Sequence, residues 1–145
     1  MTIVLGIDPG ASTGFALFVD GALQSLSTGA PSDVHSVIAL HAPTLVVFED
    51  SRLTSPTWSR GVSRQAMLKI ARNVGMVDGC CAMVTQACDA LQVPCRGISP
   101  KHKGRKLDAT SFAAITGWSK RCNQHERDAA MVAYPFRFTR IMETV

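Results

Sequence analysis

The sequence predicts an α/β fold built on a five-stranded mixed sheet: three antiparallel strands at the N-terminus, two parallel strands after them, and flanking helices. Three short strand-like segments open the chain, at residues 2–8, 14–20 and 22–28. Asp20-Gly21 between the second and third is typical of a tight hairpin turn. Later come two apolar runs, 45–48 and 93–98, and the first follows a helical pattern as a parallel strand reached by a crossover does. At 145 residues the chain has the length of one domain, so we assign 1–145 to a single domain.

Four segments have helical patterns. Pro31-Ser32-Asp33 starts the first helix, with Ser32 as the expected N-cap, and Pro43 stops it. The longest covers residues 64–91, where apolar residues recur at steps of three and four. We expect it to cover the sheet and, because its apolar surface is so wide, to contribute a dimer contact; Gly75 and Gly79 are places where it could break.

The last two helices have clear boundary signals. Asp108 is a good N-cap for a helix that ends at Gly117. Asn123 caps the final helix, with Glu126 in the capping-box position three residues later. These signals predict where both helices begin.

The charge of the chain is divided along its length. Residues 1–51 contain no Lys or Arg and have a net charge of −5, whereas the fifteen basic residues all follow and give the remainder +9. A basic region joined to an acidic cluster favours binding of a polyanion over a metal-holding centre. Solvated helix faces are the simpler explanation of the same pattern.

Composition limits the class of protein. No apolar run approaches the ~20 residues of a membrane span, and the N-terminus lacks signal-peptide features. The five cysteines form no Cys-x-x-Cys pair, which argues against zinc and disulfide frameworks. We therefore expect reduced thiols in a cytoplasmic protein.

Two predicted strands end in carboxylates. Asp8 closes the first strand and is followed at once by Pro9-Gly10, and Glu49 closes the strand over 45–48. If the two strands are parallel neighbours, both side chains emerge at the same edge of the sheet. Whether Asp50 joins them stays open.

The final helix offers two more polar side chains. His125 and Asp128 are three apart and so share one helix face near the N-terminus. Two divalent ions roughly 4 Å apart need several carboxylates from different elements, and phosphodiester hydrolysis uses such ions. Asp8, Glu49, His125 and Asp128 are thus the candidate ligands, although a lone His on a helix is more often structural.

Basic residues surround this set in the sequence. Trp58 between Arg52 and Arg60 could stack on nucleic acid or simply pack under its loop. The densest basic run offers candidate phosphate contacts at Lys101, Lys103, Arg105 and Lys106.

Three stretches resemble the RuvC-type Holliday-junction resolvases of the ribonuclease H-like superfamily. They are Gly6-Ile7-Asp8-Pro9-Gly10 with Thr13-Gly14, Val47-Phe48-Glu49-Asp50, and His125-Glu126-Arg127-Asp128-Ala129-Ala130. Their order and spacing agree across nearly the whole chain. The resemblance implies a ribonuclease H-like fold and a crossover junction endodeoxyribonuclease.

The resemblance also implies a site and partners. Catalytic carboxylates fall at Asp8, Glu49 and Asp128, and the remaining family position, an Asp or a His, falls at His125. Together they would bind two Mg²⁺ or Mn²⁺ ions. The implied enzyme is a homodimer that nicks two opposed strands of four-way DNA, and compact relatives occur in phages.

The sequence departs from the family in two places. The family often has an aromatic shortly after the catalytic Glu, whereas here the nearest is Trp58. The family's functional lysines do not align one to one with Lys101, Lys103 and Lys106.

Three alternative functions stay open. They are a nuclease for other branched or flapped substrates, a non-catalytic nucleic-acid-binding module, and an actin-like ATPase fragment. The last is considered because the strand followed by Asp-x-Gly also resembles the first phosphate loop of those ATPases.

Overall fold

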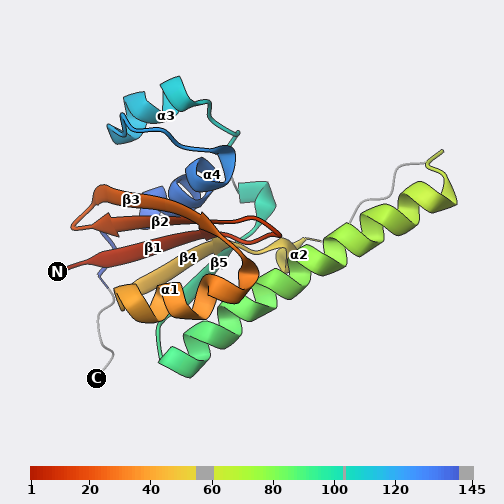
Figure 1. The fold of residues 1–145 in the computed structure, drawn as a ribbon, viewed down its shortest axis with the longest axis horizontal. Coiled ribbons are helices and arrows are strands. Elements are labelled where there is room, and N and C mark those ends of the chain that lie inside the picture. The colour runs from red at the N-terminus through yellow and green to blue at the C-terminus, as the bar shows by residue number, and fades with distance from the viewer. Residues whose placement is uncertain (55–60, 103, 141–145) are drawn as a thin grey trace.

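A five-stranded mixed sheet forms the centre of the computed structural model, which describes residues 1–54, 61–102 and 104–140. The strand order is β3-β2-β1-β4-β5, with β1 and β2 antiparallel, β2 and β3 antiparallel, and β1, β4 and β5 parallel to one another (Figure 1). The strands are β1 (Ile3–Asp8), β2 (Thr13–Val19), β3 (Ala22–Gly29), β4 (Leu45–Glu49) and β5 (Cys95–Ile98). The predicted sheet, with three antiparallel and two parallel strands, is confirmed.

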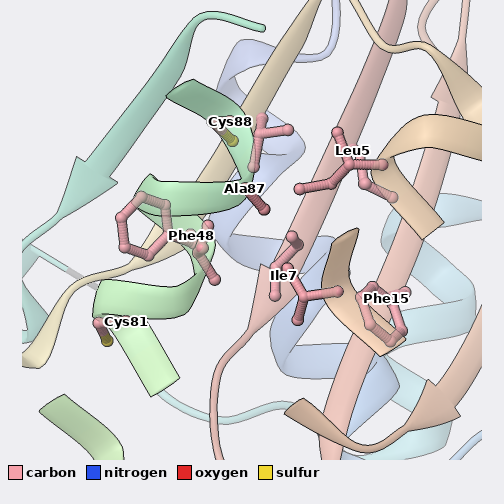
Figure 2. Close-up of a cluster of buried hydrophobic side chains, with 11 residues drawn as sticks. Leu5, Ile7, Phe15, Phe48, Cys81, Ala87 and Cys88 are labelled. Carbon is pink, nitrogen blue, oxygen red and sulfur yellow. The ribbon is translucent and has the colours of Figure 1, made fainter. Parts of the chain in front are cut away.

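Helices cover both faces of the sheet (Figure 1). On one face lie α1 (Val34–His41) and α2 (Arg64–Leu91), and on the other lie α3 (Ala109–Thr116) and α4 (Gln124–Ala133). Alternate residues of β1 contact the two layers. Leu5 and Ile7 pack with Cys81, Ala87 and Cys88 of α2 (Figure 2), whereas Val4 packs with the alanines of α4. Burial on both faces explains why the central strands are apolar throughout.

The predicted helix boundaries are confirmed except at α1. Asp108 and Asn123 accept backbone N–H groups at the starts of α3 and α4, and Gly117 ends α3 in the left-handed conformation. The prediction that Ser32 caps α1 is wrong. Pro31–Asp33 form a separate 3-10 turn, α1 begins at Val34, and the Asp33 carboxylate accepts the N–H of Ala30 instead.

The helix α2 is continuous over 28 residues, about 42 Å at 1.5 Å per residue, and neither Gly75 nor Gly79 interrupts it. Its C-terminal half supplies the buried residues, whereas its N-terminal half projects beyond the sheet (Figure 1). Met67, Ile70 and Met76 on the projecting half are 40–45% exposed. None of the helices in the described ranges has the length and apolar character needed to cross a membrane.

Two glycines let α4 contact the sheet backbone to backbone. A Cβ at Gly6 of β1 would overlap the carbonyl oxygen of Ala129, and a Cβ at Gly14 of β2 would overlap the carbonyl oxygen of His125. Because both obstacles are main-chain atoms of a packed helix, they cannot rotate away. Only glycine permits this separation between α4 and the sheet.

We therefore expect Gly6→Ala to lower the free energy of unfolding by roughly 2–3 kcal/mol, as overpacking a core does. Gly75→Ala is the matched control, because nothing lies within 4 Å of its added methyl and a helical Gly→Ala change should stabilise by about 0.5–1 kcal/mol. Urea denaturation of both variants measures the effect. Equal stability of Gly6→Ala and the wild type would contradict the tight contact.

Candidate active site at the carboxyl edge of the sheet

Asp8 and Glu49 lie at the carboxyl ends of two neighbouring parallel strands. Ile7 pairs with Phe48 in the β1–β4 register, so the two carboxylates occupy the next position along each strand. After Asp8 the chain turns through Pro9-Gly10, and the buried hydroxyl of Thr13 donates to the carbonyl of Gly10 at 2.8 Å. The prediction that both carboxylates emerge at one sheet edge is confirmed.

The start of α4 is fixed by its cap and by a residue of β3. The Asn123 side chain accepts the N–H of Glu126 at 2.9 Å, and the Glu126 carboxylate accepts the N–H of Asn123 at 3.0 Å. Thr28 of β3 accepts from the Asn123 amide at 2.7 Å and donates to Glu126 at 3.1 Å. This network holds the first turn of α4, which contains His125, against the sheet.

One cavity of about 480 Å³ brings the four candidate ligands together. Asp8, Glu49, His125 and Asp128 all line it, with Lys106 and Gln124. His125 Nδ1 lies 3.3 Å from Asp8 Oδ2. The Asp128 side chain is only 7% exposed; it accepts from Gln124 Nε2 at 2.8 Å, and Lys106 Nζ lies 3.8 Å from its other oxygen. The site thus combines carboxylates with a cation at its edge.

A contact from α2 holds the strand end that carries Glu49. The Ser51 hydroxyl donates to the Asp78 carboxylate at 2.7 Å, and the Cys81 thiol donates to the carbonyl of Glu49 at 3.5 Å. Sequence reasoning missed Ser51, Asp78, Gln124 and Thr28. Gln124 immediately precedes His125 and Ser51 directly follows Glu49-Asp50, but neither has a sequence signal of its role. Asp78 and Thr28 are far in sequence from the motifs they support, so no local pattern identifies them.

Asp50 does not line the cavity. Its carboxylate forms a two-pronged ion pair with Arg52, with Nε–Oδ1 at 2.8 Å and NH2–Oδ2 at 2.9 Å, and accepts the N–H of Arg52 at 3.1 Å. These contacts with Arg52 hold the pKa of Asp50 below its usual range, although burial opposes the shift. Asp50 therefore organises the turn after β4.

The predicted nucleic-acid-binding residues have different surroundings. Lys106 lines the cavity, and Lys101 and Arg105 are exposed on the segment between β5 and α3. Arg52 is engaged with Asp50, and its side chain remains 34% exposed. Trp58, Arg60 and Lys103 lie outside the described residues.

The donor chemistry of the cavity suits a hard divalent cation. Three carboxylates and an imidazole are ligands that Mg²⁺ and Mn²⁺ accept. Within the described ranges, however, no three His, Cys, Asp or Glu residues are grouped closely enough to hold an ion as they stand. The residues fit such an ion in kind, and binding would need side-chain rotation toward a common point.

Structure comparison places this chain among ribonuclease H-like folds. It matches Thermus thermophilus RuvC in complex with a Holliday junction substrate at a TM-score of 0.65 and 19% identity, over 95% of this chain and 94% of that one. A second T. thermophilus RuvC structure matches at a TM-score of 0.65 and 18% identity, over 94% of each chain. The yeast mitochondrial Holliday junction resolvase Ydc2 matches at a TM-score of 0.54 and 12% identity, over 94% of this chain and 78% of that one. The fold is therefore that of RuvC-type resolvases, as the motifs predicted.

Sequence comparison adds nothing to the structural likeness. Neither the scan against protein-family models nor the search of curated proteins found a match. The likeness therefore rests on three-dimensional arrangement and on the three motifs.

The Asp50–Arg52 pair gives a pH-dependent stability. A carboxyl whose pKa is lowered in the folded state stabilises the fold when it is ionised. This contribution is complete at pH values above the pKa of the unfolded state, near 3.8, and is lost as the pH falls through the lower pKa of the folded state. At pH 7 we expect Asp50→Asn to cost roughly 1–3 kcal/mol, and the gap from wild type should narrow below about pH 4. Exposed Asp89→Asn, the control, should stay within about 0.5 kcal/mol. Urea denaturation at several pH values measures this, and a gap that stays constant with pH would contradict it.

Proposed function

We propose that this chain is a metal-dependent, structure-selective endodeoxyribonuclease that resolves four-way DNA junctions by paired, symmetric nicks. One observation carries the proposal: Asp8, Glu49, His125 and Asp128 converge from β1, β4 and α4 on a single cavity. The fold shared with RuvC over nearly the whole chain supports it. The crowding of basic residues after position 51 supports a polyanionic substrate.

The proposed ligands of Mg²⁺ or Mn²⁺, two ions per site, are Asp8, Glu49, His125 and Asp128. Bound there, such ions would polarise the scissile phosphate and lower the pKa of an attacking water. Glu49 and Asp8 stand on rigid strand ends, which favours a fixed ligand geometry over one that reorganises during reaction.

The other cavity residues have roles that need no ion. The Lys106 ammonium, 3.8 Å from Asp128, is placed to contact a phosphate oxygen of the substrate strand. Gln124 holds one oxygen of Asp128 by a hydrogen bond and so orients the carboxylate. His125 can serve as a ligand. Alternatively, with Nδ1 donating to the Asp8 carboxylate 3.3 Å away, its Nε2 can accept a proton from water.

The serious alternative is the same chemistry on another branched or flapped substrate. It is favoured by the residues that follow Glu49, which are Asp50, Ser51, Arg52 and Leu53 and include no aromatic. In this structure Asp50 and Arg52 are paired and Ser51 is bound to Asp78. Cleavage of a four-way junction, compared with duplex, flap and RNA–DNA hybrid, separates the two functions.

We expect Asp8→Asn to abolish cleavage of a four-way junction and to leave binding within about threefold, because basic residues that contact phosphates supply most of the affinity. The matched control is Asp89→Asn, because Asp89 is an exposed carboxylate that does not line this cavity; this variant should cleave normally. Nicking and gel-shift assays on the same preparations measure both. Joint loss of binding and cleavage with Asp8→Asn would assign Asp8 to the fold instead.

Paired nicks require two active sites related by a two-fold axis, so we also propose a homodimer. The projecting half of α2, with exposed Met67 and Ile70, is the proposed interface. Ile70→Glu should convert the dimer to a monomer at micromolar concentration, while Lys69→Glu, a change to a residue that is already charged and exposed, should change assembly less. Analytical ultracentrifugation measures this. A wild type that remains monomeric with and without junction would remove the dimer and weaken the resolvase proposal.

A further inference from the structure

A second cavity, of about 710 Å³, adjoins the candidate active site and has no role in the mechanism above. It lies between the edge strand β5, the segment that follows it, and the helices α3 and α4. Asp128 lines both cavities, so the two adjoin at this residue. Its volume is within the range of pockets that bind small organic ligands.

The wall and the rim of this cavity differ in chemistry. The wall is apolar and includes two aromatic rings; its members are Ile98, Leu107, Ile115, Met131, Tyr134 and Phe136. The rim is basic, with the exposed side chains of Arg96, His102 and Arg105. Asp128, at the boundary with the catalytic cavity, is the one acidic residue of the described lining. An apolar, aromatic interior under a cationic rim suits a flat neutral group attached to a phosphate.

The edge strand adds hydrogen-bonding groups to the wall. The carbonyls of Pro94 and Ile98 accept from β4, so the backbone groups of these alternate residues face the sheet. Successive residues of a strand direct their backbone groups to opposite sides, so Gly97 directs its N–H and C=O away from β4. Gly97 lines the cavity through its backbone, because a Cβ at this position would be directed at the Asp50 side chain. A donor and an acceptor next to an apolar surface match the edge of a nucleobase.

We propose that this cavity receives one unstacked nucleobase of the DNA strand whose phosphate lies at the catalytic cavity. The proposal rests on the proposed nuclease function and adds a site that would favour distorted DNA. Arg137 already stacks on the Tyr134 ring at 3.8 Å, so the base would stack on the Phe136 ring while its edge meets Gly97. Arg96, whose guanidinium lies 4.9 Å from the centre of the Phe136 ring, and Arg105 would contact the flanking phosphates.

Such a pocket favours branched over duplex DNA for an energetic reason. Moving a base out of a continuous helix sacrifices stacking and pairing, and the cost is smallest where a base is already poorly stacked. Nucleotides at a branch point meet that condition. Structure selectivity would then not require an aromatic residue directly after Glu49.

The test is a binding measurement on four-way junctions that each carry one abasic nucleotide, placed in turn at the positions flanking the cleaved phosphate. Without added metal, cleavage does not interfere. For the wild type, we expect one position at which removing the base weakens binding about tenfold, and small effects at the others. If no position stands out, the inference is overturned.

A variant that fills the cavity completes the test. Ile115 is 45% exposed on α3 and lines the cavity, so Ile115→Trp should occupy the proposed base site with little effect on the core. We expect this variant to bind the intact junction about tenfold more weakly than the wild type does. Its affinity for the junction with the abasic nucleotide at the sensitive position should be no lower than its affinity for the intact junction. Leu40 of α1 is 77% exposed and lines neither cavity, so Leu40→Trp is the matched control and should bind as the wild type does.

The outcomes separate this inference from the proposed function. The base pocket alone is overturned if the wild type cleaves the junction but the effects of Ile115→Trp and of the abasic nucleotide on the binding free energy are additive. A wild type that neither binds nor cleaves branched DNA overturns the nuclease proposal and this inference with it. If Ile115→Trp fails to fold, judged by its thermal transition, Ile115→Asp, which puts a negative charge beside the rim, should show the same non-additivity.

Discussion

The close packing of α4 on the sheet is the constraint on which the rest of the site depends. Gly6 and Gly14 allow the backbone of α4 to contact β1 and β2 directly, and this contact sets the depth of the helix. At that depth His125 Nδ1 comes within 3.3 Å of Asp8, and Asp128 is buried at the cavity wall. A helix held one methyl group further away would carry its two polar residues out of reach of the strand carboxylates. The glycines of the first motif are thus as much a part of the site as Asp8 between them.

The helix α2 serves two regions through its two halves. Its C-terminal half contributes Cys81, Val84 and Cys88 to the core, and its other half projects with apolar residues exposed. Asp78 lies between these halves and holds Ser51, and Cys81 one turn later holds the carbonyl of Glu49. A partner that packs on the projecting half would therefore bear on the element that positions a candidate ligand. The proposed assembly and the geometry of the candidate site would then depend on one continuous helix, with no loop between them.

Local signals made most of the fold predictable from the sequence. Apolar strands buried on both faces, the Asp20-Gly21 turn with both residues at positive φ, and side-chain caps at Asp108 and Asn123 each depend on neighbours in the chain. The convergence at the sheet edge followed from strand direction. What failed or was missed depends on particular contacts, some local and some distant, that the sequence pattern does not indicate. Ser32 lost the cap because Pro31 opens a separate turn, and the Ser51–Asp78 bond joins residues 27 apart. Asp50 had the same sequence signal as Glu49, and only the bidentate pair with Arg52 distinguishes its role.

The division of charge along the sequence acquires a spatial meaning in the fold. The acidic N-terminal part supplies the carboxylates at the ends of β1 and β4, whereas the basic part places Lys106 at the catalytic cavity and Arg96 and Arg105 at its neighbour. A cluster of carboxylates repels a phosphate backbone, so the proposed nuclease would need cations to offset the repulsion. Bound metal would offset it at the centre, and the basic rim offsets it at the approach. Because Asp128 lines both cavities and lies 3.8 Å from Lys106, a strand bound as proposed at one cavity would be constrained in its position at the other. Substrate geometry, and not only the identity of the phosphate at the centre, would then determine which strands are held for cleavage.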